Sequence, residues 1–351
     1  MKQLASLIVL FLFLGNGGAA QQPAGSTPGS KGAATGDRKP AADAQQPDNS
    51  TATSSQSAGG TAGQSSPDNT VKVRVELVNV LATVTDRKNH LVLNLNKDDL
   101  QVLENNQPQQ IRFFSRETDL PLRVGLLIDC SNSIRERLRF EQEAAVEFLG
   151  EALRPGKDQA FVVGFDVEPQ LLQDYTDDTD KLSSAIRGIQ AGGGTGLYDA
   201  IYFACKQKML IFPPPEPYLR RVMIIISDGQ DNESEHTREE ALSMAQRAEV
   251  TIFAISTSQG GSSAGTGPNS RGDKVLTRLA QETGGRAFFP FEASDLSANF
   301  QEIARELRSQ YSLGYVSTNP SHDGTFRAIR IESRDKNLRV RTKAGYFAPT
   351  S

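Results

Sequence analysis

The stretch at residues 123–138, RVGLLIDCSNSIRERL, constrains the fold of this chain more than any other. Its branched apolar residues stop at Asp129, and two hydroxyl side chains follow at alternate positions, Ser131 and Ser133, before a helical pattern begins. A buried strand that turns directly into a helix is typical of open α/β sheets, which place their ligands at the carboxyl ends of parallel strands. Helix capping explains one serine, whereas an aspartate and two serines in alternation favour a metal site.

Two later stretches bring further oxygen ligands to the same kind of position. Residues 191–200, AGGGTGLYDA, place Thr195 in a glycine-rich loop before a helical pattern, and residues 221–232, RVMIIISDGQDN, contain a second buried-type strand that leads to Asp228. Hydroxyl and carboxylate oxygens without imidazole or thiolate are the ligand set of the hard cations Mg²⁺, Mn²⁺ and Ca²⁺. The alternative is that these loop residues only cap helices and turns.

This order of residues resembles the metal-ion-dependent adhesion site of the von Willebrand factor type A domain, which is Asp-x-Ser-x-Ser, a distant Thr and a distant Asp after a strand. The matching positions are Asp129, Ser131, Ser133, Thr195 and Asp228. The resemblance implies that the serines bind the ion directly and that the other three residues bind it directly or through water. It also implies an open coordination position, which a carboxylate of a partner protein fills. Mg²⁺ is the expected ion, with Mn²⁺ or Ca²⁺ as alternatives.

From about residue 71 to its end, the sequence is also similar to secreted bacterial proteins with a von Willebrand factor A-related domain that are numerous in acidobacteria. The stretches that carry this resemblance are ETGGRAFFP at 282–290, ELRSQYSLGY at 306–315 and RTKAGYFAP at 341–349. In that family, β segments flank the type A domain. One departure from the type A motif is Asn132, where glycine is common. The family's biological role is poorly defined, so the resemblance implies architecture more than purpose.

The amino-terminal part of the chain predicts export. Residues 1–20 combine Lys2, an apolar run and small residues that end at Ala20, which are the features of a cleaved signal peptide. An uncleaved anchor is the alternative, but the run is shorter than the ~20 residues of a spanning helix. Residues 21–70 contain no Leu, Ile, Val or aromatic residue, which predicts a disordered, flexible tether. The expected location is therefore secreted or periplasmic.

The remaining chain predicts an α/β domain between two β-rich segments. Strand patterns alternate with helical patterns across residues 119–310, which indicates a doubly wound, mostly parallel sheet with helices on both faces. Residues 71–118 and 311–351 contain only short strand patterns separated by turn signals. The two segments form either one small sandwich, interrupted by the α/β domain, or two independent β pieces.

Three local features are expected within these regions. The alternation of Leu91, Leu93 and Leu95 predicts a strand. The pair at residues 105–106, Asn-Asn, predicts a hairpin turn between strands at 100–103 and 111–114. One long amphipathic helix is expected to follow the first strand of the α/β domain directly, over residues 134–153.

Several other residues are weaker candidates. Asp199 and Asp231 are expected near the ion, behind its direct ligands, although loop capping explains each of them. Residues 271–273, Arg-Gly-Asp, match the tripeptide that integrins recognise, in a loop rich in glycine and serine, and we treat this match as coincidence. Cys130 and Cys205 are expected to be free, buried thiols. The net charge of −4 gives no reason to expect a nucleic acid partner.

The sequence gives little support to an enzyme, and no catalytic residue is predicted. Its three histidines lie in turn-like sequence without the His-Glu-x-x-His spacing of a zinc protease, and no Gly-Lys-Ser/Thr follows the glycine-rich loop. We therefore predict a secreted or periplasmic binding protein that captures an acidic side chain of a partner through a divalent ion. A metal-free scaffold of the cell envelope and, with less support, a metal-dependent hydrolase are the alternatives.

Overall fold

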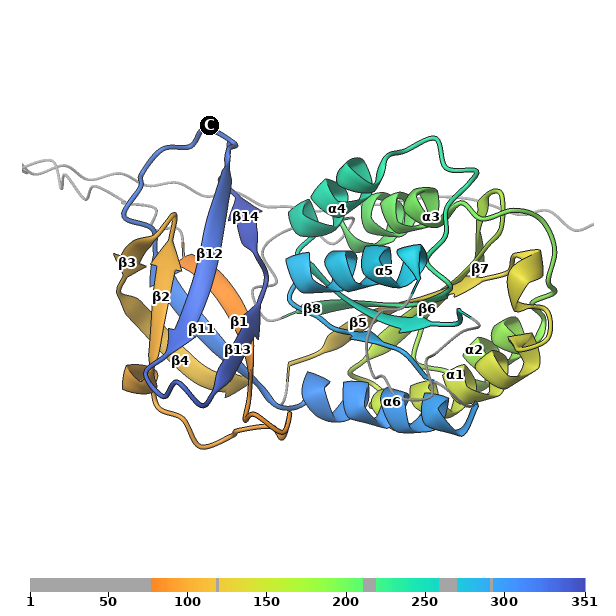
Figure 1. Ribbon diagram of the computed structural model, residues 1–351, viewed down its shortest axis with the longest axis horizontal. Helices are drawn as coiled ribbons and strands as arrows, with labels where there is room; N and C mark the ends of the chain where they lie inside the picture. Colours follow the sequence, from red (N-terminus) through yellow and green to blue (C-terminus); the bar gives the residue numbers. More distant parts are fainter. Residues whose placement is uncertain (1–76, 118–119, 211–218, 259–269, 291–292, 351) are drawn as a thin grey trace, which may run out of the picture. The chain divides into compact units, whose positions relative to one another are not determined.

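The computed structural model describes residues 77–117, 120–210, 219–258, 270–290 and 293–350. These ranges contain one six-stranded sheet with helices and two four-stranded antiparallel sheets (Figure 1). The α/β fold class with a flanking sandwich-like β module is therefore confirmed. The predicted signal peptide and tether lie outside the described residues. Within the described part of the chain, no helix has the length and apolar character needed to cross a membrane.

The six-stranded sheet has the order β10-β9-β8-β5-β6-β7, and every neighbouring pair is parallel except β6 and β7. Its strands are β5 (Leu122–Asp129), β6 (Gln159–Phe165), β7 (Pro169–Thr176), β8 (Arg220–Ser227), β9 (Val250–Ser256) and β10 (Ala287–Phe288). The strands β5, β6, β8 and β9 are nearly continuous apolar runs, as expected for strands that are covered on both faces. The antiparallel edge strand β7 is absent from the sequence prediction, because its residues are largely exposed and form no buried run.

Helices cover both faces of this sheet (Figure 1). One face carries α1 (Leu138–Ala152), α2 (Thr179–Arg187) and α6 (Ala293–Leu307). The other face carries α3 (Leu197–Phe203), the π-helical turn η3 (Ala204–Met209), α4 (Arg238–Arg247) and α5 (Arg271–Glu282). The predicted helix at 134–153 begins four residues late, at Leu138, because a separate 3₁₀ turn, η2 (Asn132–Ile134), follows β5 first.

The strands before and after the α/β domain pair with each other. One antiparallel sheet has the order β13-β1-β11-β4, and the other has the order β14-β12-β2-β3. Their bounds are β1 (Leu77–Thr85), β2 (Leu100–Glu104), β3 (Gln107–Gln109), β4 (Ile111–Glu117), β11 (Gln310–Val316), β12 (Phe326–Ser333), β13 (Arg339–Thr342) and β14 (Gly345–Phe347). Each sheet thus contains strands from both β-rich segments, and the two sheets share one hydrophobic core. The exact domain boundaries at residues 118–119 and 310–311 stay predictions.

The strand predicted from Leu91, Leu93 and Leu95 is wrong. Leu91 makes only an isolated bridge with Thr85, and residues 92–96 form no strand. The reason is a tertiary contact. The buried Tyr311 hydroxyl donates to the Val92 carbonyl and accepts from the Leu95 N–H, each at 3.0 Å, and so binds backbone groups that a partner strand would otherwise bind.

The hairpin turn at Asn105 and Asn106 is present, but it joins different strands from those predicted. It connects β2 to the short strand β3, rather than to residues 111–114, which form part of β4 in the other sheet. Both asparagines have positive φ, 47° and 64°, as a two-residue hairpin turn of this kind requires.

The shared core predicts that the two β-rich segments are stabilised together. Leu313 in β11 is fully buried in this core. Leu313→Ala is therefore expected to lower the free energy of unfolding by about 2–5 kcal/mol and to speed amide hydrogen exchange in β1 and β4, which pair with β11. The control is Leu77→Ala in the same sheet, where the side chain is 52% exposed and little change is expected. Unchanged protection of β1 and β4 in Leu313→Ala would contradict the shared core.

Candidate metal centre

Asp129 is held at the end of β5 beside the neighbouring strand β8. The register pairs Ile128 with Ile226, so Asp129 lies next to Ser227, whose hydroxyl donates to Oδ2 of Asp129 at 2.7 Å. Oδ1 of Asp129 accepts from the backbone N–H of Ser131 at 2.9 Å. The side chain is fully buried. These bonds fix the carboxylate at the carboxyl edge of the sheet, between the two strands that lie at its centre.

The two serines of the motif lie side by side. Ser131 has an extended backbone, and the 3₁₀ turn η2 follows it and contains Ser133. The two hydroxyl oxygens are 2.8 Å apart, within hydrogen-bond distance. Ser131 is buried, whereas Ser133 is exposed. The pair therefore presents two oxygens at one point, with solvent on the Ser133 side.

Thr195 reaches the same edge of the sheet in a loop that contacts the loops on both sides. The N–H of Gly192 donates to the Cys130 carbonyl at 2.7 Å, in the loop that follows β5. The N–H of Thr195 donates to Oδ1 of Asn232 at 2.8 Å, and the Thr195 carbonyl accepts from the Asn232 N–H at 3.0 Å, in the loop that follows β8. The glycine-rich loop therefore joins the loops that carry the two aspartates.

Asp228 directly follows β8, so two carboxylates lie at neighbouring strand ends. It is buried, and its two oxygens accept from the backbone N–H and the side-chain amide of Gln230 at 2.9 and 3.2 Å. Burial raises the pKa of Asp129, and repulsion from Asp228 raises it further, while hydrogen bonds from Ser131 and Ser227 oppose these effects. A cation bound here would relieve the repulsion between the two acids.

A third acidic side chain, Glu141, is buried in α1, although the motif does not include it. Glu141 lies in the first turn of α1 and is 1% exposed, and neither of its carboxylate oxygens has a hydrogen-bond partner among the described residues. Burial and repulsion from Asp129 and Asp228 raise the pKa of Glu141 to about 8, while Arg137 opposes the shift. The sequence signal was the helical spacing, because Glu141 is three residues after Leu138 and so falls on the inward stripe of α1.

The predicted supporting residues Asp199 and Asp231 hold the loop between β8 and α4. Asp199 accepts from the backbone N–H of His236 at 2.9 Å and contacts its ring at 2.6 Å. Asp231 accepts from the Tyr198 N–H at 3.0 Å and from the Ser234 hydroxyl at 2.6 Å. These hydrogen bonds cap a loop and the end of a helix. A role for either residue behind the ion stays a prediction.

The Arg-Gly-Asp tripeptide at residues 271–273 does not lie in a loop, contrary to the sequence prediction. It forms the first turn of α5, and Asp273 is buried. A Cβ atom at Gly272 would lie 2.1 Å from the Asp228 carbonyl oxygen, so glycine allows α5 to approach the loop of the candidate site. Gly229 in the same contact has a φ of 75°, which favours glycine. The tripeptide therefore takes part in the packing of α5 against the loop after β8.

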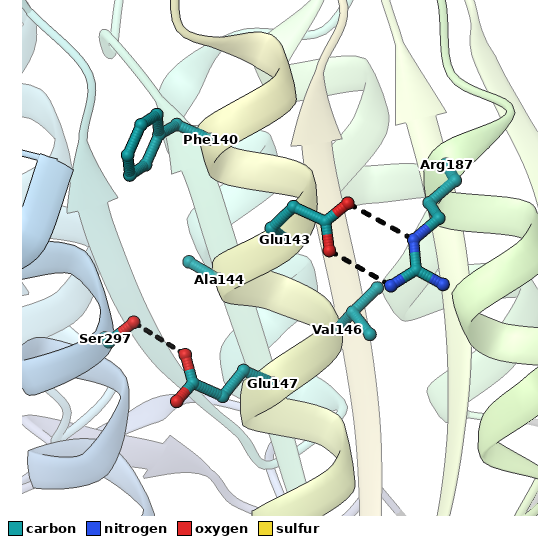
Figure 2. A pocket seen from close by; sticks show the side chains of 7 residues that line it. All are labelled: Phe140, Glu143, Ala144, Val146, Glu147, Arg187 and Ser297. Carbon is teal, nitrogen blue, oxygen red and sulfur yellow. Dashed lines mark hydrogen bonds and ion pairs between the residues drawn. The ribbon is translucent and has the colours of Figure 1, made fainter.

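A cavity of about 440 Å³ beside α1 contains none of the five predicted ligands (Figure 2). It is lined by Phe140, Glu143, Ala144, Val146, Glu147, Arg187 and Ser297. Glu143 forms an ion pair with Arg187 at 3.0 Å, and Glu147 accepts from the Ser297 hydroxyl at 2.7 Å. Two exposed acids of α1, Glu143 and Glu147, are thus partnered within the protein, in contrast to Glu141.

The donor set at the sheet edge fits a hard cation. The separation of 2.8 Å between the Ser131 and Ser133 hydroxyls matches the edge of an octahedral shell with bonds of ~2.1 Å, which is about 3 Å. No group of three His, Cys, Asp or Glu side chains that could hold a metal occurs in the described ranges.

The two cysteines are not suited to bind the ion. Cys130 and Cys205 are free and buried, and burial raises the pKa of Cys130 to about 12, which makes it a poor ligand.

A comparison with protein families finds the von Willebrand factor type A domain at residues 124–306, more than half of the chain. The chain belongs to this family. The match includes all five motif positions and ends at the carboxyl end of α6. The family resemblance stated from the sequence is confirmed. A search of curated protein sequences gives no significant match.

Several solved structures are similar to this type A protein. BatB from Bacteroides thetaiotaomicron is 19% identical over 54% of this chain and 100% of its own, with a TM-score of 0.41. Proximal thread matrix protein 1 from the mussel byssus, with a zinc-occupied MIDAS motif, is 18% identical over 59% of this chain and 50% of its own, with a TM-score of 0.46. The vWF domain of the pili tip protein Mfa5 from Porphyromonas gingivalis is 15% identical over 53% and 94%, with a TM-score of 0.42.

Glu141 predicts that the ion-free protein loses stability as pH rises. Its pKa in the fold is about 8, above the ordinary value of 4.5, so the unfolded chain releases this proton first. The Glu141 contribution to the unfolding free energy should fall between pH 4.5 and about 8, at up to ~1.4 kcal/mol per pH unit. Glu141→Gln removes this contribution and should gain stability over wild type across that window.

The measurement is urea unfolding in EDTA as a function of pH. Glu147→Gln is the matched control, because it removes the same charge from the exposed side of the same helix and should follow the wild-type curve. Parallel stability curves for wild type and Glu141→Gln would contradict the account of Glu141.

Proposed function

We propose that this protein is a non-enzymatic binding module that captures an acidic side chain of a partner protein through a divalent cation. The observation that carries this proposal is the pair of serine hydroxyls 2.8 Å apart, beside the buried carboxylate Asp129, at the carboxyl edge of the sheet. Membership of the type A family supports it. The leader-like residues 1–20 support a secreted or periplasmic location.

In this proposal, each motif residue has a stated part. Ser131 and Ser133 bind the ion directly, and Thr195, Asp129 and Asp228 bind it directly or through water. Mg²⁺ is the main ion, and Mn²⁺ or Ca²⁺ can replace it, because all the donors are oxygens. Ser133 is exposed and the other four residues are buried, so a partner carboxylate would approach the ion from the Ser133 side.

The sequence contains one short match to a serine-hydrolase pattern. Residues 261–265, GSSAG, match the pattern Gly-x-Ser-x-Gly, which is functional when the serine stands at a sharp strand-to-helix turn. The pattern begins at residue 261, whereas β9 ends at Ser256, and it lies outside the described residues.

A metal-free scaffold of the envelope is the alternative that ion-binding measurements would favour if no ion bound.

Asp129→Asn is expected to weaken Mg²⁺ and Mn²⁺ binding at least about tenfold. The amide keeps the shape of the carboxylate and removes its charge, so the fold should remain. Calorimetric titration of the whole chain measures the affinities, and circular dichroism checks the fold. The control Asp180→Asn removes an exposed carboxylate from α2 and should bind both ions as wild type does. If Asp129→Asn binds with wild-type affinity, the ion site is elsewhere or absent.

Partner binding is expected to depend on the ion. A partner recovered from a cell-envelope extract should bind in surface plasmon resonance with Mg²⁺ present and should lose binding in EDTA. One Asp→Asn or Glu→Gln substitution in the partner should have the same effect. Thr195→Ala should weaken binding without unfolding the domain, because Thr195 lies in a loop and its loss opens no core cavity. Affinity that is unchanged in EDTA would show that recognition uses another surface.

A further inference from the structure

We propose that Arg135 recognises the acidic side chain of the partner, by donating hydrogen bonds to the carboxylate that binds the ion. This inference rests on the proposed function, because it adds a partner-binding residue to the same site. The five-residue motif supplies oxygens for the ion but no cationic group for the partner. Arg135 would supply that group on the exposed side of the site, two residues after Ser133 in the chain.

The first observation is that contacts within the protein hold Arg135 beside the serines of the motif. The turn η2 ends at Ile134, and the N–H of Arg135 donates to the Asn132 carbonyl at 3.5 Å. Nη2 of Arg135 donates to Oδ1 of Asn132 at 2.9 Å. Asn132 lies between Ser131 and Ser133, whose hydroxyl oxygens are 2.8 Å apart. The guanidinium group is therefore bonded to the residue between the two serines.

The second observation is that the same contacts reach the glycine-rich loop of Thr195. Nδ2 of Asn132 donates to the Gly193 carbonyl at 3.3 Å. Nη2 of Arg135 donates to the Ala191 carbonyl at 3.5 Å. Arg135 is thus held between the two loops that carry both serines and the threonine of the motif. An arginine side chain that is fixed in this way loses less conformational entropy when it binds a ligand.

The third observation concerns the hydrogen-bond donors that remain. Both side-chain hydrogen bonds of Arg135 use Nη2, and no partner of Nε or Nη1 occurs among the described residues. Arg135 is exposed, and no ion pair joins it to an acidic side chain in these ranges, whereas the exposed Arg187 is paired with Glu143 at 3.0 Å. A guanidinium group with free donors is suited to a carboxylate, because its N–H groups match the carboxylate oxygens.

Two acidic side chains lie against the same glycine-rich loop and would repel a partner carboxylate. A Cβ atom at Gly193 would lie 2.9 Å from a carboxylate oxygen of Asp166. A Cβ atom at Gly194 would lie 2.8 Å from a carboxylate oxygen of Glu233. Arg135 contacts this loop before the two glycines. A partner carboxylate is therefore attracted by Arg135 and repelled by the two acids, which favours its approach beside Arg135.

The alternative is that Arg135 only braces the two loops. The two roles predict different effects on the ion. Loss of a brace would weaken the binding of the ion and of the carboxylate together. Loss of a cation that binds the partner would weaken carboxylate binding alone. The affinity for Mn²⁺ would then stay the same or increase, because one positive charge near the ion is removed.

The test compares Arg135→Gln with wild type in the whole chain, using Mn²⁺ and acetate as probes. Calorimetry measures the Mn²⁺ affinity. The relaxation rate of water protons measures acetate binding at constant ionic strength, because acetate displaces water from the bound Mn²⁺. Arg135→Gln should need about fivefold more acetate and should bind Mn²⁺ at least as tightly as wild type. The control Arg139→Gln removes an exposed arginine from the first turn of α1 and should match wild type in both measurements.

Two results would overturn the proposal. One is a joint loss of acetate and Mn²⁺ affinity in an Arg135→Gln variant that circular dichroism shows to be folded, because that loss identifies a brace. The other is an unchanged acetate affinity. Should Arg135→Gln unfold, Arg135→Lys replaces it. The ammonium group keeps the charge but not the paired donors, so the acetate affinity should fall by a smaller factor while the Mn²⁺ affinity stays unchanged.

The same measurements separate this proposal from the proposed function. If wild type binds Mn²⁺ and acetate, and Arg135→Gln binds both equally well, the ion site stands and the assignment of Arg135 is wrong. If wild type binds no Mn²⁺, or if acetate leaves the water relaxation of wild type unchanged, the proposed function fails and the assignment of Arg135 fails with it.

Discussion

The burial of two carboxylates, Asp129 and Asp228, at neighbouring strand ends is the constraint on which the candidate site depends. The chain leaves β5 towards β6 on one side and returns to β8 on the other, so the loops after β5 and β8 diverge from the centre of the sheet. Open α/β sheets place their ligands at this topological switch point. Here it places two acids at neighbouring strand ends and buries them, and burial, with a smaller contribution from repulsion by Asp228, raises the pKa of Asp129. A cation is the simplest ligand that compensates the burial of two carboxylates.

The surrounding structure holds the acids in place. Ser227 and the Ser131 N–H bind the Asp129 carboxylate, Gln230 binds Asp228, and the glycine-rich loop of Thr195 joins the two loops. The close approach of α5, which glycine permits at Gly272, supports the Asp228 loop from its other side. Hydrogen bonds within the protein thus fix the side chains of the site, which lowers the entropy that ion binding must overcome.

Local patterns were sufficient to predict the parts of this site that belong to strand ends. The apolar runs before Asp129 and Asp228 identify buried strands, and parallel pairing brings their ends together. The features that were missed depend on tertiary contacts. The Tyr311 hydroxyl replaces a strand near Leu95, and β7 pairs at the sheet edge although its residues are largely exposed. The helical spacing places Glu141 on the inward stripe of α1, but the sequence does not show that its buried carboxylate lacks a hydrogen-bond partner among the described residues.

The most direct measurement of the central claim is X-ray diffraction from crystals of this protein grown with Mn²⁺, with data collected at the manganese absorption edge. The account predicts one strong anomalous peak within coordination distance of the Ser131 and Ser133 hydroxyl oxygens, at the edge of the sheet between β5 and β8. An absence of anomalous signal at this position in well-ordered crystals, at a Mn²⁺ concentration that saturates binding in solution, would contradict it.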